Sequence, residues 1–191
     1  MDFKLILQIV GVALGLFYLY LEYRANIWLW AVGIIMPMVH AVLYYRSGLY
    51  ADFSMEIFYI IVGIYGLCVW LRKPEGKKGS GLQISFATRS VWYIAIAMYG
   101  ISHAIIYQLL VNFTDSTVPF WDSLSTSLSI VAYWMLSRKY VEQWLVWLVV
   151  DVITVGLYMY KDIPLTAGLY ALYTALAIVG YMRWRKMAVN E

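Results

Sequence analysis

Long apolar stretches dominate the chain, and short polar joints separate them. Seven stretches come close to the 20 or so mainly apolar residues that a helix needs to cross a bilayer. They occupy residues 5–21, 27–45, 50–71, 90–112, 120–137, 141–160 and 164–182. The pattern predicts an all-α integral membrane protein with seven transmembrane helices, which nearly exhaust the chain and leave no soluble domain.

The composition supports this prediction and excludes several functions. Hydrophobic residues make up 63% of the chain and charged residues only 13%, against about 45–50% and 25% in soluble domains. The lone Cys68 supports neither a disulfide nor a cysteine metal cluster. No HExxH, GxxxxGK or CxxC pattern and no nucleophile–base pairing occurs. We therefore expect no enzyme activity, no cofactor, no metal site and no nucleic-acid partner.

The Lys and Arg residues are unevenly divided between the two sides of the predicted membrane. One side collects Arg24, Arg72, Lys73, Lys77, Lys78, Arg89, Arg138, Lys139, Arg183, Arg185 and Lys186. The other side has only Lys4, Arg46 and Lys161, together with Asp2, Asp115 and Asp162. Because cytoplasmic loops carry the positive excess, the N-terminus is expected outside and the C-terminus in the cytoplasm. The mildly acidic outer side favours a cationic solute.

Two parts of the chain resemble each other. LYYRSGLYADFSMEIFYIIVGIYGLCVWLRK matches LYMYKDIPLTAGLYALYTALAIVGYMRWRK, and the match pairs Tyr45-Arg46 with Tyr160-Lys161 at an offset of 115. After a one-residue gap the offset becomes 114. At this second offset the match pairs Tyr59 with Tyr173, Gly66 with Gly180 and Trp70 with Trp184. Residues 1–73 and 120–186 are therefore predicted to be two three-helix repeats, linked by a helix over 90–112.

An odd number of helices per repeat determines the architecture. A three-helix unit reverses direction across the membrane, and the linking helix reverses it again, so the two triplets run parallel. This 3+1+3 plan is that of the SWEET sugar transporters, and it places a binding site between the triplets near mid-membrane. It argues for a transporter over a non-transporting receptor or assembly subunit.

The segment 141–160 carries the deepest charge. A carboxylate inside a span costs about 2.5–3.5 kcal/mol on insertion scales, so Asp151 is a functional candidate. Trp144, Trp147 and Asp151 have the spacing i, i+3, i+7 of one helix face, which Tyr158 continues. Such an aromatic wall ending in a carboxylate suits a flat cationic heteroaromatic. Alternatively, Trp144 is an interface anchor and Asp151 hydrogen-bonds a neighbouring helix.

Six further candidates lie in other segments. Asp52 and Glu56 share a face of segment 50–71, where Asp52 can also be a helix cap, and Tyr59 follows nearly one turn deeper. Pro37 kinks segment 27–45, where it can act as a hinge beside His40, and its counterpart at offset 115 is Val152. His40 and His103 can relay protons or simply bond a neighbour.

Segment 120–137 presents a polar series that ends in two aromatic residues: Asp122, Ser125, Thr126, Ser129, Tyr133 and Trp134. The hydroxyl groups can bind solute, or they can bond back to carbonyl groups of their own helix, which is common in membranes.

These segments also resemble a known family. GLYADFSMEIFYIIVGIYGLCVW resembles the third-helix signature of the PnuC vitamin transporters. WDSLSTSLSIVAYWMLSRK resembles their fifth helix, and RKYVEQWLVWLVVDVITVGLYMYK with YALYTALAIVGYMRW resembles their sixth and seventh. The resemblance covers most of residues 22–186. It implies facilitated vitamin uptake across the bacterial inner membrane, a homotrimer, and trapping of the solute by cytoplasmic phosphorylation. It maps the Trp-x-x-Trp motif onto Trp144 and Trp147 and an acidic site residue onto Asp52.

Departures from the family pattern bear on the solute. Nicotinamide riboside carriers tend to have Gln where this chain has Glu56, Gln near Tyr133, and Asn where Gln143 stands. A glutamate can accept from the aminopyrimidine of thiamine or balance its thiazolium. The sequence therefore favours thiamine, carried by the PnuT branch of the family, over nicotinamide riboside, although both solutes are cationic.

Overall fold

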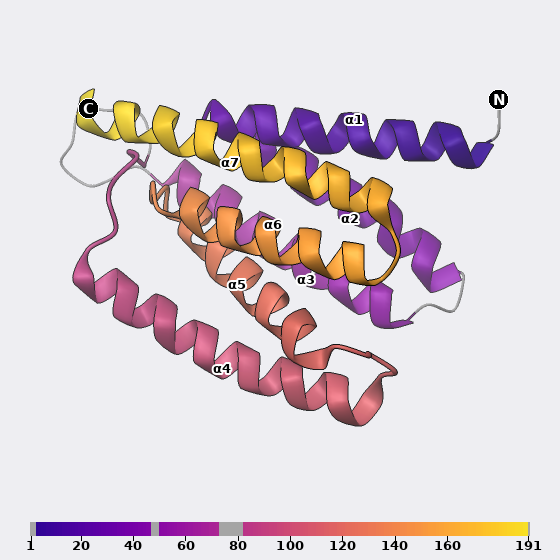
Figure 1. Ribbon diagram of the computed structural model, residues 1–191. Helices are drawn as coiled ribbons and strands as arrows, with labels where there is room; N and C mark the ends of the chain where they lie inside the picture. Colours follow the sequence, from indigo (N-terminus) through magenta and orange to yellow (C-terminus); the bar gives the residue numbers. More distant parts are fainter. Residues whose placement is uncertain (1–2, 47–49, 73–81, 191) are drawn as a thin grey trace. The chain divides into compact units, whose positions relative to one another are not determined.

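The computed structural model describes residues 3–46, 50–72 and 82–190, with the backbone alone at 3–11, 44, 50–52, 54–55, 165 and 190 (Figure 1). Seven α-helices fill these ranges. They are α1 (Phe3–Tyr23), α2 (Trp28–Arg46), α3 (Tyr50–Leu71), α4 (Arg89–Phe113), α5 (Pro119–Ser137), α6 (Gln143–Tyr160) and α7 (Pro164–Asn190). Each predicted stretch forms one helix, so the all-α prediction is confirmed over the described residues.

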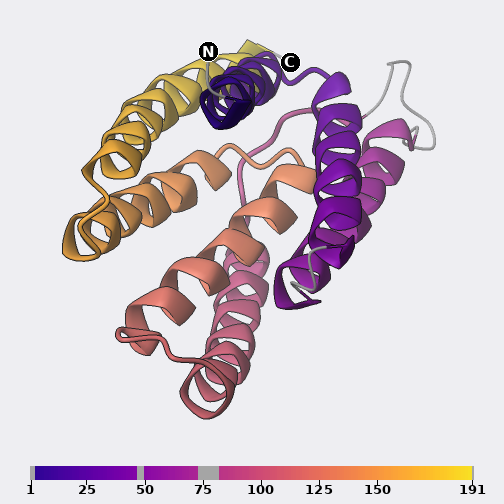
Figure 2. The ribbon, with the colours of Figure 1, turned by 90° about the vertical axis from the view of Figure 1, so that its right-hand side faces the viewer.

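The chain divides into two compact units, Met1–Leu82 and Gln83–Glu191. In the first unit α2 packs along α3, and α1 contacts α2. In the second, α6 packs between α5 and α7, and α5 also contacts α4; Figure 2 shows α6 and α7 as neighbouring helices joined by a short turn. The helix α4 thus groups with α5–α7. The parallel 3+1+3 arrangement of the triplets stays a prediction.

The helices have lengths suited to a bilayer. Their 18 to 27 residues correspond to about 27–40 Å at 1.5 Å per residue. By length and composition α4 and α6 qualify as candidate membrane spans within the described chain, and shorter apolar segments lie at Val12–Tyr23, Trp28–Leu43 and Glu56–Leu71. Of its side chains, α4 buries only Val91 and Ala95. A helix that is apolar on its exposed faces is suited to lipid rather than to water.

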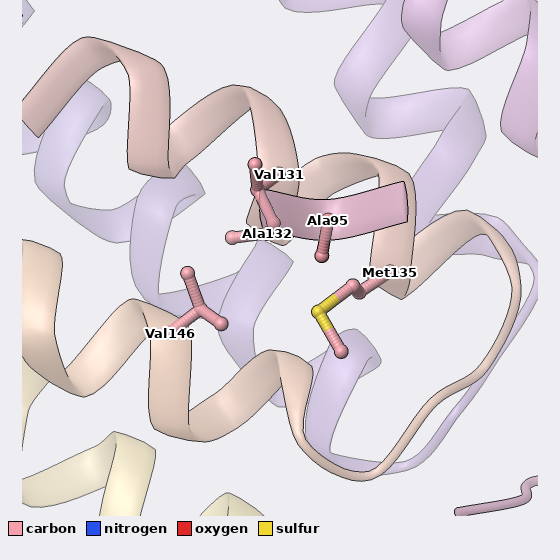
Figure 3. Close-up of a cluster of buried hydrophobic side chains, with 5 residues drawn as sticks. All are labelled: Ala95, Val131, Ala132, Met135 and Val146. Carbon is pink, nitrogen blue, oxygen red and sulfur yellow. The ribbon is translucent and has the colours of Figure 1, made fainter. Parts of the chain in front are cut away.

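A small apolar cluster holds α4, α5 and α6 together. Figure 3 shows Ala95 of α4, Val131, Ala132 and Met135 of α5, and Val146 of α6 pointing toward one another. All five side chains are buried. This packing positions the first turns of α6, where several candidate residues lie.

The turns α1–α2 and α5–α6 have the same geometry 114 residues apart. Ala25 has φ 49° and Lys139 has φ 54°. The amide of Asn26 donates to the Leu21 carbonyl at 2.9 Å, and that of Tyr140 donates to the Met135 carbonyl at 3.1 Å. Each is a Schellman ending, in which a residue in the left-handed region closes the helix. The sequence similarity therefore extends to backbone conformation.

A tryptophan–glycine contact also recurs at this offset. In the first unit the rings of Trp30 and Trp70 meet edge-on, with centroids 5.6 Å apart. A Cβ placed on Gly66 would lie 2.3 Å from the Trp30 ring, so the two helices pack closely only because this residue is glycine. The same three residue types pack in the same way in the second unit.

One constant offset relates the two triplets. The helices α2 and α6 end at Arg46 and Tyr160, and α3 and α7 begin at Tyr50 and Pro164, each pair 114 residues apart. The one-residue gap inferred from the sequence is therefore not needed, because the Tyr-Arg and Tyr-Lys pairs are similar without being structurally equivalent. As a result, the structural counterpart of Pro37 is Asp151, not Val152.

Candidate functional site

A stripe of buried polar side chains and one half-buried aromatic side chain runs along α6. Gln143, Trp147, Asp151 and Thr154 follow one another at spacings of four, four and three residues, which places them on one helix face. Gln143 is fully buried, Asp151 is 6% exposed and Thr154 is 7% exposed. Sequence reasoning named three of these residues but missed Thr154, although it lies one turn beyond Asp151.

Trp144 lies at the edge of the stripe, and its indole ring is packed against α7. Its ring centroid is 6.0 Å from that of Trp184, nearly perpendicular, and a Cβ on Gly180 would lie 2.6 Å from the ring. Trp30 makes the same contacts 114 residues earlier. These contacts give Trp144 a packing role between α6 and α7, whereas the sequence suggests a binding residue or an interface anchor.

Trp147 points toward α5 and meets Tyr133. The two ring centroids are 5.0 Å apart and the rings are perpendicular. Within the described residues the Trp147 indole N–H and both polar atoms of the Gln143 amide are buried without a hydrogen-bond partner. An unpaired buried polar group costs about 1–3 kcal/mol. A polar ligand or a water molecule is therefore expected to form hydrogen bonds with these buried groups.

Asp151 is the acidic member of the stripe. No hydrogen bond or ion pair of this carboxylate occurs in the described part of the chain. It lies close enough to the Tyr173 phenol on α7 to act on it electrostatically. A buried carboxylate is costly unless a positive charge or hydrogen-bond donors accompany it. Asp151 is thus suited to receive a cation.

Thr154 connects the stripe to α5. Its hydroxyl donates to the Val150 carbonyl at 2.7 Å and lies 3.1 Å from the Ser125 hydroxyl. Since the Thr154 proton is used within α6, Ser125 is the donor in that pair, and its own oxygen keeps free lone pairs. Ser129 donates back to the Ser125 carbonyl at 2.9 Å, as the second interpretation of these hydroxyls predicted.

Asp122 and Trp134, two further candidates, make contacts elsewhere in the second unit. The Asp122 carboxylate accepts from Lys161 Nζ at 2.8 Å and from the Ser116 hydroxyl at 2.7 Å. It thereby ties the start of α5 to the α6–α7 turn. Trp134 packs against the apolar cluster, with its ring centroid 6.3 Å from that of Tyr140.

In the first unit a second polar group gathers on α2 and α3. His40 Nδ1 lies 3.5 Å from Glu56 Oε1, with the His40 side chain 45% exposed and that of Glu56 12% exposed. Glu56 acts electrostatically on Tyr59, nearly one turn further along α3. Pro37 is buried one turn before His40. Asp52 is helical, but its side chain lies outside the described side chains.

The constant offset relates the two polar groups. Tyr59 corresponds to Tyr173, and each of these tyrosines lies within electrostatic reach of a carboxylate. The two carboxylates are not equivalent positions of the repeat, because Glu56 is on α3 and Asp151 is on α6. Sequence reasoning overlooked Tyr173 as a site residue, although the repeat had already paired it with Tyr59.

Comparison with known proteins gives three findings. Residues 5–186 match the model of a family described as nicotinamide mononucleotide transporters. The nicotinamide riboside transporter PnuC of Escherichia coli K12 is 24% identical to this chain, and the match covers 93% of this chain and 84% of the relative. The riboflavin/roseoflavin transporter RibM of Streptomyces davaonensis is 27% identical, and the match covers 93% of this chain and 83% of the relative. A crystal structure of the vitamin B3 transporter PnuC superposes with a TM-score of 0.70 at 22% identity, covering 95% of this chain and 81% of that one.

Proposed function

The chain belongs to the nicotinamide mononucleotide transporter family, the PnuC family, and from that premise we propose that it is a uniporter for a cationic, aromatic, water-soluble vitamin. The members are membrane transporters of vitamins, not enzymes. Thiamine is the favoured solute. The observation that carries the proposal is Asp151, a buried carboxylate with no counter-charge among the described residues, which lies one helical turn from Trp147 of the Trp147–Tyr133 ring pair.

The stripe on α6 provides each type of contact that such a solute needs. Asp151 balances the positive ring, and Trp147 and Tyr133 offer aromatic surface for stacking and cation–π attraction. The Gln143 amide offers one donor and one acceptor side by side, which matches the edge of an aminopyrimidine. The Ser125 oxygen remains free to accept from an amino or hydroxyl group.

Thiamine is preferred because the chain has a second carboxylate, Glu56, where riboside carriers tend to have an amide. Nicotinamide riboside is the second candidate, because the E. coli relative is named for that solute and its pyridinium would also satisfy Asp151. Riboflavin, for which the Streptomyces relative is named, is uncharged and leaves Asp151 without a counter-ion.

The mechanism that we propose is rocking of the two triplets about a central site, without ion coupling. From the resemblance we further propose a homotrimer in the bacterial inner membrane and solute trapping by cytoplasmic phosphorylation. In proteoliposomes without a trapping enzyme, the solute should equilibrate and not accumulate. Accumulation driven by a proton gradient would contradict uniport.

The deciding experiment is calorimetric titration of the purified protein with thiamine, nicotinamide riboside and riboflavin. We expect thiamine to bind most tightly. Replacement of Asp151 by Asn should weaken thiamine binding about 10–100-fold, since loss of a hydrogen-bonded charge costs about 1.5–3 kcal/mol. Asp162→Asn, which changes an exposed carboxylate, is the matched control. Tight riboside binding without thiamine binding would overturn the choice of solute.

Glu56→Gln tests the basis of the thiamine preference. The neutral side chain should weaken thiamine about tenfold, because a favourable charge–charge interaction is lost. An uncharged thiamine analogue should lose much less. Equal losses for the two ligands would show that the charge of Glu56 does not select the solute.

A further inference from the structure

The segment before α4 crosses the α5–α6 turn and is hydrogen-bonded to it. We call this segment, residues 82–88, the strap. The Ser85 amide donates to the Lys139 carbonyl at 3.1 Å, and the Val141 amide donates to the Ser85 carbonyl at 3.0 Å. Ser85 and Tyr140 thus form an isolated parallel bridge. Ile84 and Val141 are buried at this crossing.

Glu142 adds a side-chain bond to the crossing. Its Oε2 atom accepts from the Ala87 amide at 2.8 Å. Glu142 occupies the N-cap position of α6, yet its side chain caps no amide of that helix. A carboxylate accepting a backbone N–H is a strong, charge-assisted bond. The carboxylate next to Gln143 is therefore used to hold the strap.

The equivalent turn in the first unit carries a different side-chain contact. There the Asn26 side chain accepts from the Trp28 amide at 3.0 Å, so the turn is closed by its own residues. Trp28 stands at the position equivalent to Glu142. Both turns have the same backbone geometry. This turn geometry therefore does not by itself require a carboxylate at the position of Glu142.

We propose that Glu142 is a positioning residue and that the strap is a latch that stays closed throughout transport. The latch makes α4 move as one body with α5–α7, and it fixes the first turns of α6, from which Gln143 and Trp147 extend. Further along α4, the apolar cluster of Ala95, Val131 and Val146 also attaches α4 to α5 and α6. This inference rests on the proposed transport function for its readout.

The first test compares Glu142→Ala with Glu142→Gln, which keeps an acceptor oxygen, and uses Gln83→Ala at an exposed strap residue as the control. Loss of the bond in Glu142→Ala should weaken solute binding about tenfold, while Glu142→Gln should stay within about twofold of the wild type. Only variants that remain monodisperse with unchanged thermal stability are compared. The positioning role would be overturned if Glu142→Ala bound solute as tightly as the wild type. It would also be overturned if Glu142→Ala and Glu142→Gln lost equal solute affinity.

The second test locks the strap with the double substitution Ser85→Cys and Tyr140→Cys in a Cys68→Ser background. Bridge partners have Cα separations in the range that a disulfide spans. Transport by the oxidised protein should stay within about twofold of the reduced protein, because the latch does not open. A block on oxidation that a reductant reverses would overturn the latch. Lack of transport in both the reduced protein and the wild type would instead contradict the proposed function.

Discussion

The indole ring of Trp144 leaves no room for a methyl group at Gly180, and the same is true of Trp30 and Gly66. Because this tryptophan–glycine contact recurs in both triplets, it is explained by packing that both triplets need. Asp151 has the chemically different counterpart Pro37, so its presence needs another reason. At the residue scale, the repeat thus identifies Trp144 as a packing residue and leaves Asp151 as a site candidate.

The Gly180→Ala variant tests the packing role. The added Cβ meets the Trp144 ring, so the variant should lose about 1–3 kcal/mol of stability. Gly168→Ala is the matched control on the same helix, since nothing lies within 4 Å of its Cβ position. The control should be neutral or up to about 1 kcal/mol more stable, because alanine is the better helix former. Thermal unfolding in detergent measures both, and equal stabilities would contradict the close packing.

At the scale of the element, pairs of helices are joined by different means at the two ends of the second unit. The strap and Glu142 join α4 to the α5–α6 turn. At the other end, Asp122 and Lys161 join the start of α5 to the α6–α7 turn. Between these ends, the Ser125 and Thr154 hydroxyl groups form a polar contact between α5 and α6.

The Asp122–Lys161 ion pair allows a test of whether Asp122 attaches α5 to the α6–α7 turn or binds solute. Both side chains are partly exposed, so Asp122→Asn should cost no more than about 1 kcal/mol of stability. Solute affinity should stay within about twofold of the wild type, because the carboxylate is engaged with Lys161 and Ser116. Asp115→Asn, at an exposed residue, is the control. A large loss of affinity in calorimetry would return Asp122 to the binding site.

At the scale of the whole molecule, the charge bias of the joints predicts the orientation in the membrane. Asp115 lies on the predicted outer side and Arg185 on the predicted cytoplasmic side, and both side chains are exposed. In a Cys68→Ser background, Asp115→Cys should react with a membrane-impermeant maleimide in intact cells. Arg185→Cys should react only after permeabilisation. The reverse pattern would invert the topology.

Several residues of the candidate site could be proposed from the sequence because their chemistry is rare in apolar helices. Asp151, Glu56 and Trp147 stand out in the sequence by type and by spacing. The roles of Trp144, Asp122 and Gln143 did not follow, because spacing within one helix does not tell which neighbouring helix a side chain meets. Thr154 and Tyr173 were overlooked because a single hydroxyl in a span is common.

The sequence by itself determined the seven helices, the repeat and the acidic character of the candidate site, since all three depend on residue types at local or periodic positions. The tertiary structure alone decided that Trp144 packs on Gly180, that Ser125 bonds Thr154, and that the strap bonds Glu142. These contacts join residues 29 to 55 positions apart. Such pairings depend on how folded helices lie against one another, which local pattern does not encode.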